Sequence, residues 1–411
     1  MPRPRPVKRI ELNEEHTTRR LVLAVAFLAA GVILLVYTVI RMLTPDAEWV
    51  NIEGNSGGET NCAAEFIFLY HLESTDLSGR EEQRAVTALY TRLCENAFQV
   101  FHNQLEVEGV NNLRAINRRP NEVLAVDGAL YEAFEVMERS GSRLLYLGPV
   151  YDRYAGVFYC EDDGQLADFD PRISEDVARE YLEYAAFAND PQAVRLELLG
   201  ENRVRLSVSQ AYLEYAEREG IESFIDFAWM RNAFIADYIA GELSAQGYDR
   251  GALTSYDGFA RCMDGSGEAY SLYLYDRQGT NVYGAAELRY QGPMSIVSLR
   301  DYPINDLDAG RFYQTRSGEM RTPYVDPADG LCRSAAPNLV CYAGDKGCGE
   351  ILLEMAPVYI ADDFRKEALA ALKAEGIESI YCEDGVICPS EKDAVLRQLY
   401  EDENVSYRVE Y

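Results

Sequence analysis

The sequence is poor in the residues on which many catalytic sites are built. Its 411 residues include only three histidines and two tryptophans. His16 precedes the one long apolar run, while His71 and His102 lie in segments that have the patterns of a strand and a helix. Three scattered histidines exclude a multi-histidine metal site and give little basis for a histidine-based triad. We interpret His71 and His102 as structural or surface residues.

Several motifs of known chemistry are also absent. The chain has no P-loop, no G-x-S-x-G elbow, no H-E-x-x-H pair and no G-x-G-x-x-G fingerprint after a strand. Its nine cysteines include no C-x-x-C pair. We therefore expect the cysteines to be small core residues, with one or two disulfides near the C-terminus, and not a zinc site.

Basic residues are scarce relative to acidic ones. There are 68 Asp and Glu residues against 39 Lys and Arg, which gives a formal net charge of −29. Such a surface repels polyanions, so we expect no nucleic acid or anionic lipid partner. A chain with 48% hydrophobic and 26% charged residues has the composition of a globular protein and not of a disordered one.

One uncharged apolar run stands out from this polar background. It covers residues 21–40, from Leu21 to Ile40, and twenty helical residues match a hydrocarbon core of about 30 Å. Residues 1–20 hold six basic and three acidic residues, and positively charged flanks stay in the cytoplasm. The sequence thus predicts a single-pass protein of the cell membrane, with a cytoplasmic N-terminus and an extracytoplasmic C-terminal domain. No small-x-small cleavage site follows the run, which disfavours a signal peptide.

The rest of the chain divides into a linker, one large domain and a tail. Residues 41–60 are polar and rich in glycine, as expected of a tether. We expect residues 61–392 to form the extracytoplasmic domain and residues 393–411 to form a C-terminal tail. Strand and helix signals alternate without the rhythm of a doubly wound sheet, so the predicted fold class is α+β.

Local patterns locate several elements of this domain. Residues 64–72 form an apolar run that predicts a buried strand, and Ser78 with Glu81 forms a capping box before a helix. The other expected elements are a hairpin over 194–208, a helix over 230–245, strands over 270–275, 282–290 and 294–299, a helix over 363–374, and a hairpin over 379–388 that turns on Asp384 and Gly385.

Read in order, the segments between residues 60 and 390 resemble the FAD:protein FMN transferase family, the ApbE-like proteins. The most specific piece is the Asp-Pro-x-x-Gly sequence of residues 326–330, which stands where the family has HIIDPxTG. The other similar segments are residues 112–117 (NLRAIN, family SEISRLN), 126–131 with 148–151 (family GPLxxLW), 232–239 (NAFIADYI, family KGYIADxI), 256–258 (YDG, family LGGD), 299–302 (LRDY, family SGDY) and 349–354 (GEILLE, family ADALST).

The resemblance implies an ApbE-like, T-fold-like mixed domain behind the membrane segment. Members of the family are often exported and tethered, and they use Mg²⁺ to transfer FMN from FAD onto a threonine of a partner protein. For this chain it therefore implies FAD and Mg²⁺ as candidate cofactors and a protein partner at the outer membrane face. The positions that would bind the flavin are Asn232, Asp257, Gly258, Asp301, Tyr302, Asp326 and Gly330, and those that would bind the metal are Glu350 and Glu354; no catalytic residue is assigned.

The working positions of the family motifs are substituted in this sequence. Where the family has a lysine that could bind phosphate, this chain has a neutral amide. Where the family has glycines whose backbone lies close to the ligand, this chain has residues with side chains. The substituted positions are Asn232 for lysine, Ala233, Asp257 and Arg300 for glycines, Pro323 for histidine, Asp329 for threonine, and Glu350 and Glu354 for the aspartate and threonine of the metal segment.

Each candidate residue also has a simpler interpretation. Glu350 and Glu354 are four residues apart and could share Mg²⁺ or Ca²⁺ on a helix, but an acidic surface helix is the more common reason for such a pair. Residues 326–330 have the composition of a turn. Packing in the core is likewise the ordinary role of the aromatic and apolar candidates near the flavin position, which are Tyr302, Trp229 and Met230.

Three functional hypotheses remain. The first is an extracytoplasmic binding or scaffold protein that keeps the fold but has lost flavin transfer. The second is an active, magnesium-dependent FAD:protein FMN transferase with substituted ligands. The third is an unrelated exported interaction domain. Because the substitutions fall on the working positions, while the order of the segments follows the family, we favour the first.

Overall fold

The computed structural model describes residues 49–54, 60–72, 75–263, 269–392, 395–400 and 405–411. The expected membrane segment, residues 21–40, lies outside these ranges. Within the described ranges, no helix has both the length and the apolar character needed to span a bilayer.

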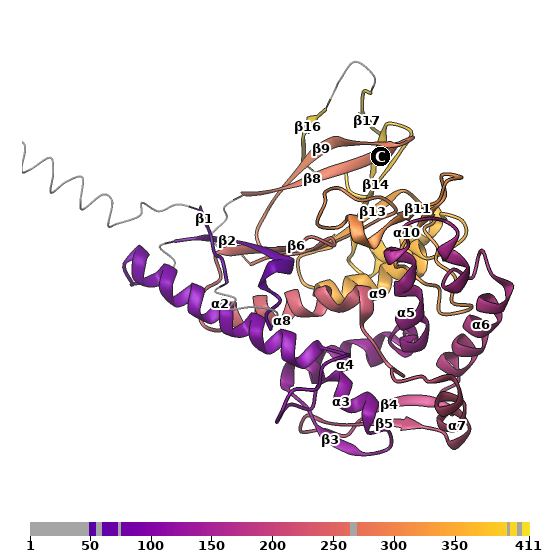
Figure 1. The fold of residues 1–411 in the computed structure, drawn as a ribbon. Coiled ribbons are helices and arrows are strands. Elements are labelled where there is room, and N and C mark those ends of the chain that lie inside the picture. The colour runs from indigo at the N-terminus through magenta and orange to yellow at the C-terminus, as the bar shows by residue number, and fades with distance from the viewer. Residues whose placement is uncertain (1–48, 55–59, 73–74, 264–268, 393–394, 401–404) are drawn as a thin grey trace, which may run out of the picture.

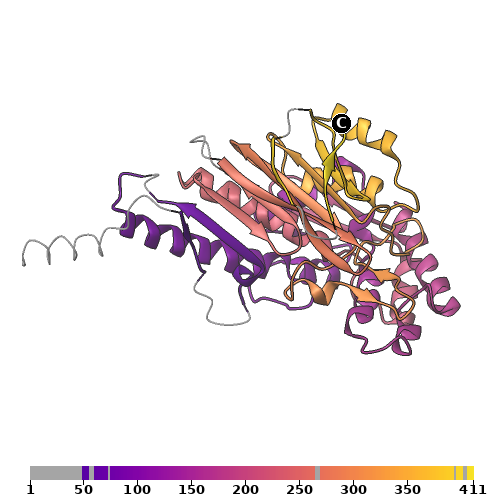
Figure 2. The same cartoon turned by 90° about the horizontal axis from the view of Figure 1, so that it is seen from above.

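A nine-stranded sheet runs through the centre of the molecule (Figures 1 and 2). Its neighbouring strands are antiparallel, except that β15 and β17 pair in parallel. In spatial order the strands are β1 (Trp49–Asn51), β2 (Phe66–His71), β6 (Gly251–Ser255), β7 (Phe259–Cys262), β10 (Met294–Arg300), β13 (Asn338–Ala343), β14 (Glu378–Glu383), β15 (Val386–Pro389) and β17 (Arg408–Val409).

Different layers cover the two faces of this sheet (Figure 1). On one face lie the helices α2 (Gly79–Phe101), α8 (Arg231–Ala245) and α9 (Cys348–Tyr359). On the other face lies a three-stranded sheet made of β16 (Val395–Leu399), β9 (Asn281–Gln291) and β8 (Ala269–Gln278). Residues 393–411, expected as a tail, thus contribute two strands, β16 and β17, to folded sheets. The central sheet has an apolar core on each side.

A second group of elements extends below the helical face in Figure 1. It contains the small sheet β3 (Val123–Ala125), β5 (Arg203–Val208) and β4 (Val194–Leu198). Around this sheet and the central layers lie the helices α3 (Leu113–Arg118), α4 (Gly128–Ser140), α5 (Gly148–Tyr154), α6 (Glu175–Asn189), α7 (Gln210–Glu219) and α10 (Lys366–Ala374), and the ribbon β11 (Tyr313–Gln314) and β12 (Met320–Arg321).

The elements expected from local patterns are confirmed. Helix α2 begins at the capping box, where Ser78 N donates to Glu81 Oε2 at 3.3 Å, and it buries its apolar stripe. The last hairpin turns at Asp384 and Gly385, which both have positive φ angles. Such turns are decided by neighbouring residues, so they can be inferred from sequence.

The cysteines are core residues, as expected, but they form no disulfide. All nine lie in the described part of the chain, all are free, and seven are buried. Cys382 and Cys388 sit on neighbouring strands, yet their partners across the ladder are Ile387 and Tyr381. The expected disulfides near the C-terminus are therefore wrong for this structure, because the strand register does not place the two thiols opposite each other.

Asn117 ties the helical group to the segment that leads into α8. Its Oδ1 accepts hydrogen bonds from the backbone of Phe224 and Ile225 at 2.9 and 3.0 Å, and its Nδ2 donates to Ile225 O at 2.9 Å. Asn117 is only 2% exposed, so water does not compete for these bonds. The side chain thus fixes the backbone that precedes Trp229.

We expect Asn117→Ala to lower the free energy of unfolding by about 3 kcal/mol or more, because it leaves three buried backbone groups without partners. Urea unfolding followed by circular dichroism would measure the change. Asn281→Ala, at an exposed asparagine of β9, is the control and should change stability by less than about 0.5 kcal/mol. Equal effects of the two variants would contradict this role of Asn117.

Candidate functional site

The expected flavin-binding residues come from segments that converge where α8 begins, beside the ends of β6, β7 and β10. Asn232, in the first turn of α8, lies against the β6–β7 turn, and its Nδ2 donates to Asp257 Oδ2 and to Glu65 Oε2, each at 3.0 Å. Gly258 follows with a φ of +107°, and a Cβ there would lie 2.2 Å from Ser298 O. The structure therefore brings Asn232, Asp257 and Gly258 together, as the resemblance predicts.

Side chains of the protein itself fill the space between these segments. A cavity of only about 10 Å³ remains, which is room for about one water molecule. Ligand pockets commonly measure about 300–1,000 Å³. The cavity is lined by Trp229, Asp257, Phe259, Arg300, Arg311, Phe312, Pro323 and Tyr324. A flavin ring does not fit here.

Arg300 is the central filling residue, and it stands where the family motif has glycine. Its guanidinium pairs with Asp308 and donates to Tyr256 O at 3.2 Å, and the side chain is almost fully buried. Asp308 is equally buried, and its Oδ1 also accepts from the backbone N–H groups of Ile304 and Asn305, each at 3.1 Å. The ion pair therefore anchors the loop after β10 over the site.

A second ion pair closes the same space. Arg311 Nη1 lies 2.5 Å from Asp257 Oδ2, the same oxygen that accepts from Asn232. Asp257 Oδ1 and Asn232 Oδ1 are buried and have no hydrogen-bond partner among the described residues. One water in the small cavity would be enough to serve such an oxygen.

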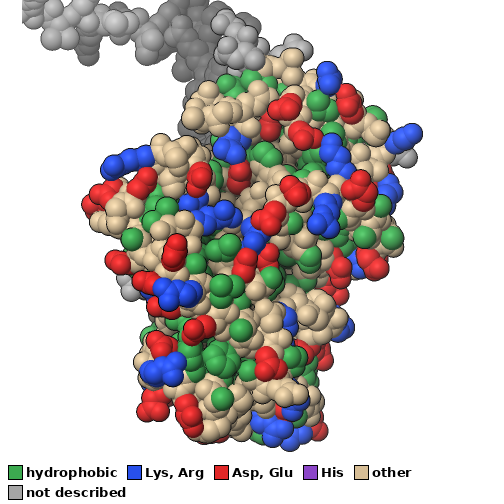
Figure 3. All heavy atoms as spheres, turned by 90° about the vertical axis from the view of Figure 1, so that its right-hand side faces the viewer, with side chains coloured by type: hydrophobic (Ala, Val, Ile, Leu, Met, Phe, Trp, Pro, Cys, Tyr) green, Lys and Arg blue, Asp and Glu red, His purple; other side chains and the backbone are tan. Residues whose placement is uncertain are grey.

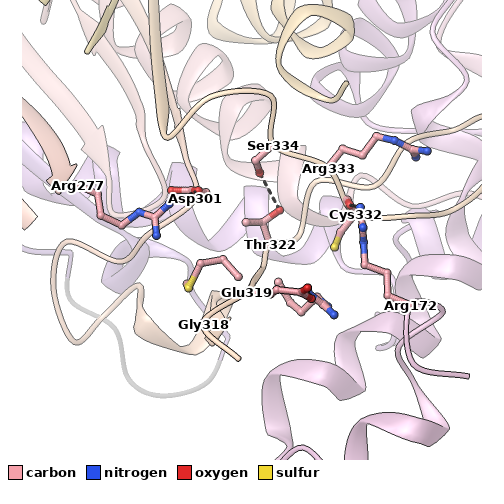
Figure 4. Close-up of a pocket in the computed structure, with 11 residues that line it drawn as sticks. Arg172, Arg277, Asp301, Gly318, Glu319, Thr322, Cys332, Arg333 and Ser334 are labelled. Carbon is pink, nitrogen blue, oxygen red and sulfur yellow. Dashed lines mark hydrogen bonds and ion pairs between the residues drawn. The ribbon is translucent and has the colours of Figure 1, made fainter. Parts of the chain in front are cut away.

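Asp301 and Tyr302 face away from the filled cavity. Tyr302 is buried, and its hydroxyl donates to Tyr275 O at 2.9 Å. Asp301 Oδ2 lies 2.7 Å from Arg277 Nη2, and burial raises the pKa of this carboxyl to about 6 despite the neighbouring guanidinium. Asp301 lines a separate pocket of about 430 Å³ (Figure 4).

Residues 326–330 form a tight turn. Asp326 Oδ1 accepts from Ala328 N at 2.8 Å, Asp326 O accepts from Gly330 N at 2.9 Å, and Gly330 has a φ of +76°. Arg333 closes the turn, because its two terminal nitrogens lie 2.6 and 2.7 Å from the oxygens of Asp329. Asp326 and Gly330 thus serve the turn, and the carboxylates at this position are already matched by a guanidinium.

The expected metal residues are placed on α9 but do not converge. Glu350 Oε2 accepts from Gly347 N at 3.2 Å and so caps its own helix, while its Oε1 lies 3.1 Å from Arg139 Nη2. Glu354 points into solvent. No group of three or more His, Cys, Asp or Glu residues suited to a metal ion occurs in the described ranges.

At the start of α9, the free backbone N–H groups are bound by a carboxylate of the protein, and an arginine balances the charge of that carboxylate. Asp237, on α8, accepts hydrogen bonds from the backbone N–H groups of Cys348 and Gly349, each at 2.8 Å. The guanidinium of Arg261 lies beside it, with Nε 3.4 Å from Asp237 Oδ1. A cation at this carboxylate would have to displace the arginine, so the residues present do not fit Mg²⁺.

Sequence reasoning missed Asp308, Arg311, Asp237 and Arg261. The available signal was Arg300 itself, since a long cation in place of glycine must find a nearby partner when buried. Its partner is eight residues away, whereas Arg311 and Asp257 are 54 residues apart and Asp237 and Cys348 are 111 apart. Partners that are 54 or 111 residues apart form no pattern that can be recognised in the sequence around either residue.

The fold is that of the ApbE proteins. No family model and no curated protein matches the sequence. Among solved structures, the ApbE protein of Thermotoga maritima is similar with a TM-score of 0.54 and 11% identity, over 86% of this chain and 97% of that one. The flavin transferase ApbE of Vibrio cholerae has a TM-score of 0.54 and 14% identity, over 85% of this chain and 96% of that one. The α+β class and the ApbE-like fold expected from the sequence are thereby confirmed.

The raised pKa of Asp301 predicts a pH-dependent contribution to stability. The folded protein holds this proton up to about pH 6, whereas the unfolded chain releases it near pH 4, so ionisation lowers stability as the pH rises between these values. Relative to Asp301→Asn, the wild type should lose roughly 2–3 kcal/mol of unfolding free energy between pH 4 and pH 7. Urea unfolding at both pH values measures the difference.

Asp306→Asn is the control, because Asp306 is an exposed aspartate of the following loop. The difference between wild type and this variant should stay constant over the same pH range. A constant difference for Asp301→Asn as well would show that burial does not perturb the Asp301 carboxyl.

Proposed function

We propose that this chain is a membrane-anchored, extracytoplasmic protein with the ApbE fold that has lost flavin transfer and acts as a binding or scaffold protein. The observation that carries the proposal is the filled flavin position. Arg300 with Asp308, and Arg311 with Asp257, fill the space between the segments to which the family resemblance assigns the flavin. The neutralised start of α9 supports the same conclusion for the metal.

Opening this site carries a large energetic cost. Separating a buried ion pair leaves a charge without a partner, which costs about 3–5 kcal/mol. A flavin that had to break the Arg300–Asp308 pair would lose roughly a hundredfold or more in affinity, since 1.4 kcal/mol corresponds to a factor of ten. The loop after β10 would also have to leave its place.

The proposed anchor places the domain close to the membrane. Strand β1 begins at Trp49, and the apolar run ends at Ile40. The residues between them, fully extended, span at most about 3.6 Å each, or roughly 30 Å in all. A partner of this domain would therefore be met near the outer membrane surface.

The alternative is an active, magnesium-dependent FAD:protein FMN transferase that flavinylates a threonine of a partner. This alternative is supported by the flavin transferase ApbE of Vibrio cholerae, which shares the fold over most of this chain. The same measurement decides between the two functions.

Purified full-length protein in detergent should show no saturable FAD binding by calorimetry at high micromolar FAD, with or without Mg²⁺. The double variant Arg300→Gly with Asp308→Asn removes both buried charges together and opens the cavity. It should bind FAD saturably, with a Kd at least about tenfold below the highest FAD concentration at which the wild type shows no binding.

The control double variant is Lys366→Ala with Glu383→Ala, which removes an exposed ion pair remote from the site. It should bind FAD no better than the wild type. Tight, magnesium-dependent binding by the wild type, or transfer of FMN to a threonine-containing acceptor, would instead favour the active transferase.

A further inference from the structure

A second pocket lies beside the filled flavin position. Its volume of about 430 Å³ falls within the range of small-molecule sites. Its walls come from Arg172 in the segment before α6, the end of β8, the end of β10, the β11–β12 ribbon and residues 332–334 (Figure 4). Distant parts of the chain thus build one concave site outside the family motifs, with Asp301 as the one shared residue.

Four arginines line this pocket, and two of them each pair with two or more carboxylates. Arg321 Nε lies 2.6 Å from Asp170, and its Nη1 lies 3.0 Å from Glu319. Arg333 is held by Asp326 and Asp329 of its own loop and by Asp362, which follows α9. These two side chains shape the wall but have little donor capacity left.

The other two arginines keep unused donors. Arg277 donates through Nη2 to Asp301, while its Nε is buried and has no partner within the described ranges. Arg172 is exposed and donates through Nη2 to the carbonyl of Cys332 at 2.8 Å. In Figure 4, Arg277 and Arg172 lie on opposite sides of the pocket.

Two hydroxyl groups lie between these arginines. Thr322 Oγ1 and Ser334 Oγ are 3.2 Å apart and hydrogen-bond to each other (Figure 4). Guanidinium and hydroxyl donors together are the groups that recognise the oxygens of a carboxylate or a phosphate. A planar guanidinium can offer two parallel donors to such an oxyanion.

We propose that this pocket binds a small molecule through a carboxylate or phosphate group, held by Arg172 and Arg277 with the hydroxyls of Thr322 and Ser334. The net charge of the protein limits the size of the ligand. Acidic and basic side chains are interspersed over the face in Figure 3, and the whole chain carries a net charge of −29. A long polyanion would meet this excess negative charge, whereas a small anion is enclosed by the pocket.

The test is calorimetric titration of the full-length protein in detergent with inorganic phosphate and, separately, with succinate. Sodium chloride keeps the ionic strength constant, so that screening does not change between titrations. At least one probe should bind saturably with one site per chain. Arg172→Gln and Arg277→Gln should each weaken this binding by about tenfold or more, as expected for the loss of a charge-assisted hydrogen bond.

Arg195→Gln is the matched control. Arg195 is an exposed arginine of the β4–β5 hairpin that pairs with Glu197, so its loss should leave binding unchanged. Arg172 is exposed, which protects that variant against misfolding, while circular dichroism checks the fold of Arg277→Gln. The stronger of the two probes identifies the ligand as a phosphate or a carboxylate compound.

The proposal fails if neither probe binds the wild type saturably, or if Arg172→Gln binds as tightly as the wild type. It also fails if FAD displaces the bound probe, because the pocket would then belong to a flavin site. These outcomes are separate from the absence of FAD binding proposed above, since phosphate or succinate binding is measured without flavin.

Discussion

Two opposite charges shielded from water, on Arg300 and Asp308, determine how the centre of this protein is organised. Neither group is stable in the interior without the other, because a lone buried charge loses its hydration without compensation. Asp308 also accepts backbone hydrogen bonds from its own loop, so the pair holds the chain after β10 in one place. Arg311 and Phe312 follow directly and complete the filling. Arg300, which stands where the family resemblance has a glycine, thus forms part of the protein interior at this position.

The fold tolerates this change because its stability has other sources. Apolar cores on both sides of the nine-stranded sheet hold the layers together, and they do not include the charged groups of the site. The ApbE fold can therefore persist while the chemistry at its centre is altered. This is the general reason why function has to be argued from a site and not from a fold.

Arginines stand beside several carboxylates in and around the candidate site. Arg261 stands beside Asp237 at the start of α9, Arg139 beside Glu350, and Arg333 beside Asp329. A guanidinium remains charged when buried and offers several donors in one plane, so it can satisfy carboxylates that would otherwise need a metal or a ligand. Self-neutralisation of this kind is consistent with a protein that binds partners without transferring flavin.

The sequence by itself determined the elements whose causes are local. The capping box before α2 and the hairpin at Asp384 and Gly385 depend on residues within a few positions of one another. The ordered motifs also predicted the fold, and they assigned Asn232 and Asp257 to one candidate site. Only the tertiary structure decided that Arg311 meets Asp257, that Asp237 caps α9, and that Asp301 faces a different pocket from its expected one. Burial and charge pairing between distant segments have no local signature, because they arise only when the layers pack.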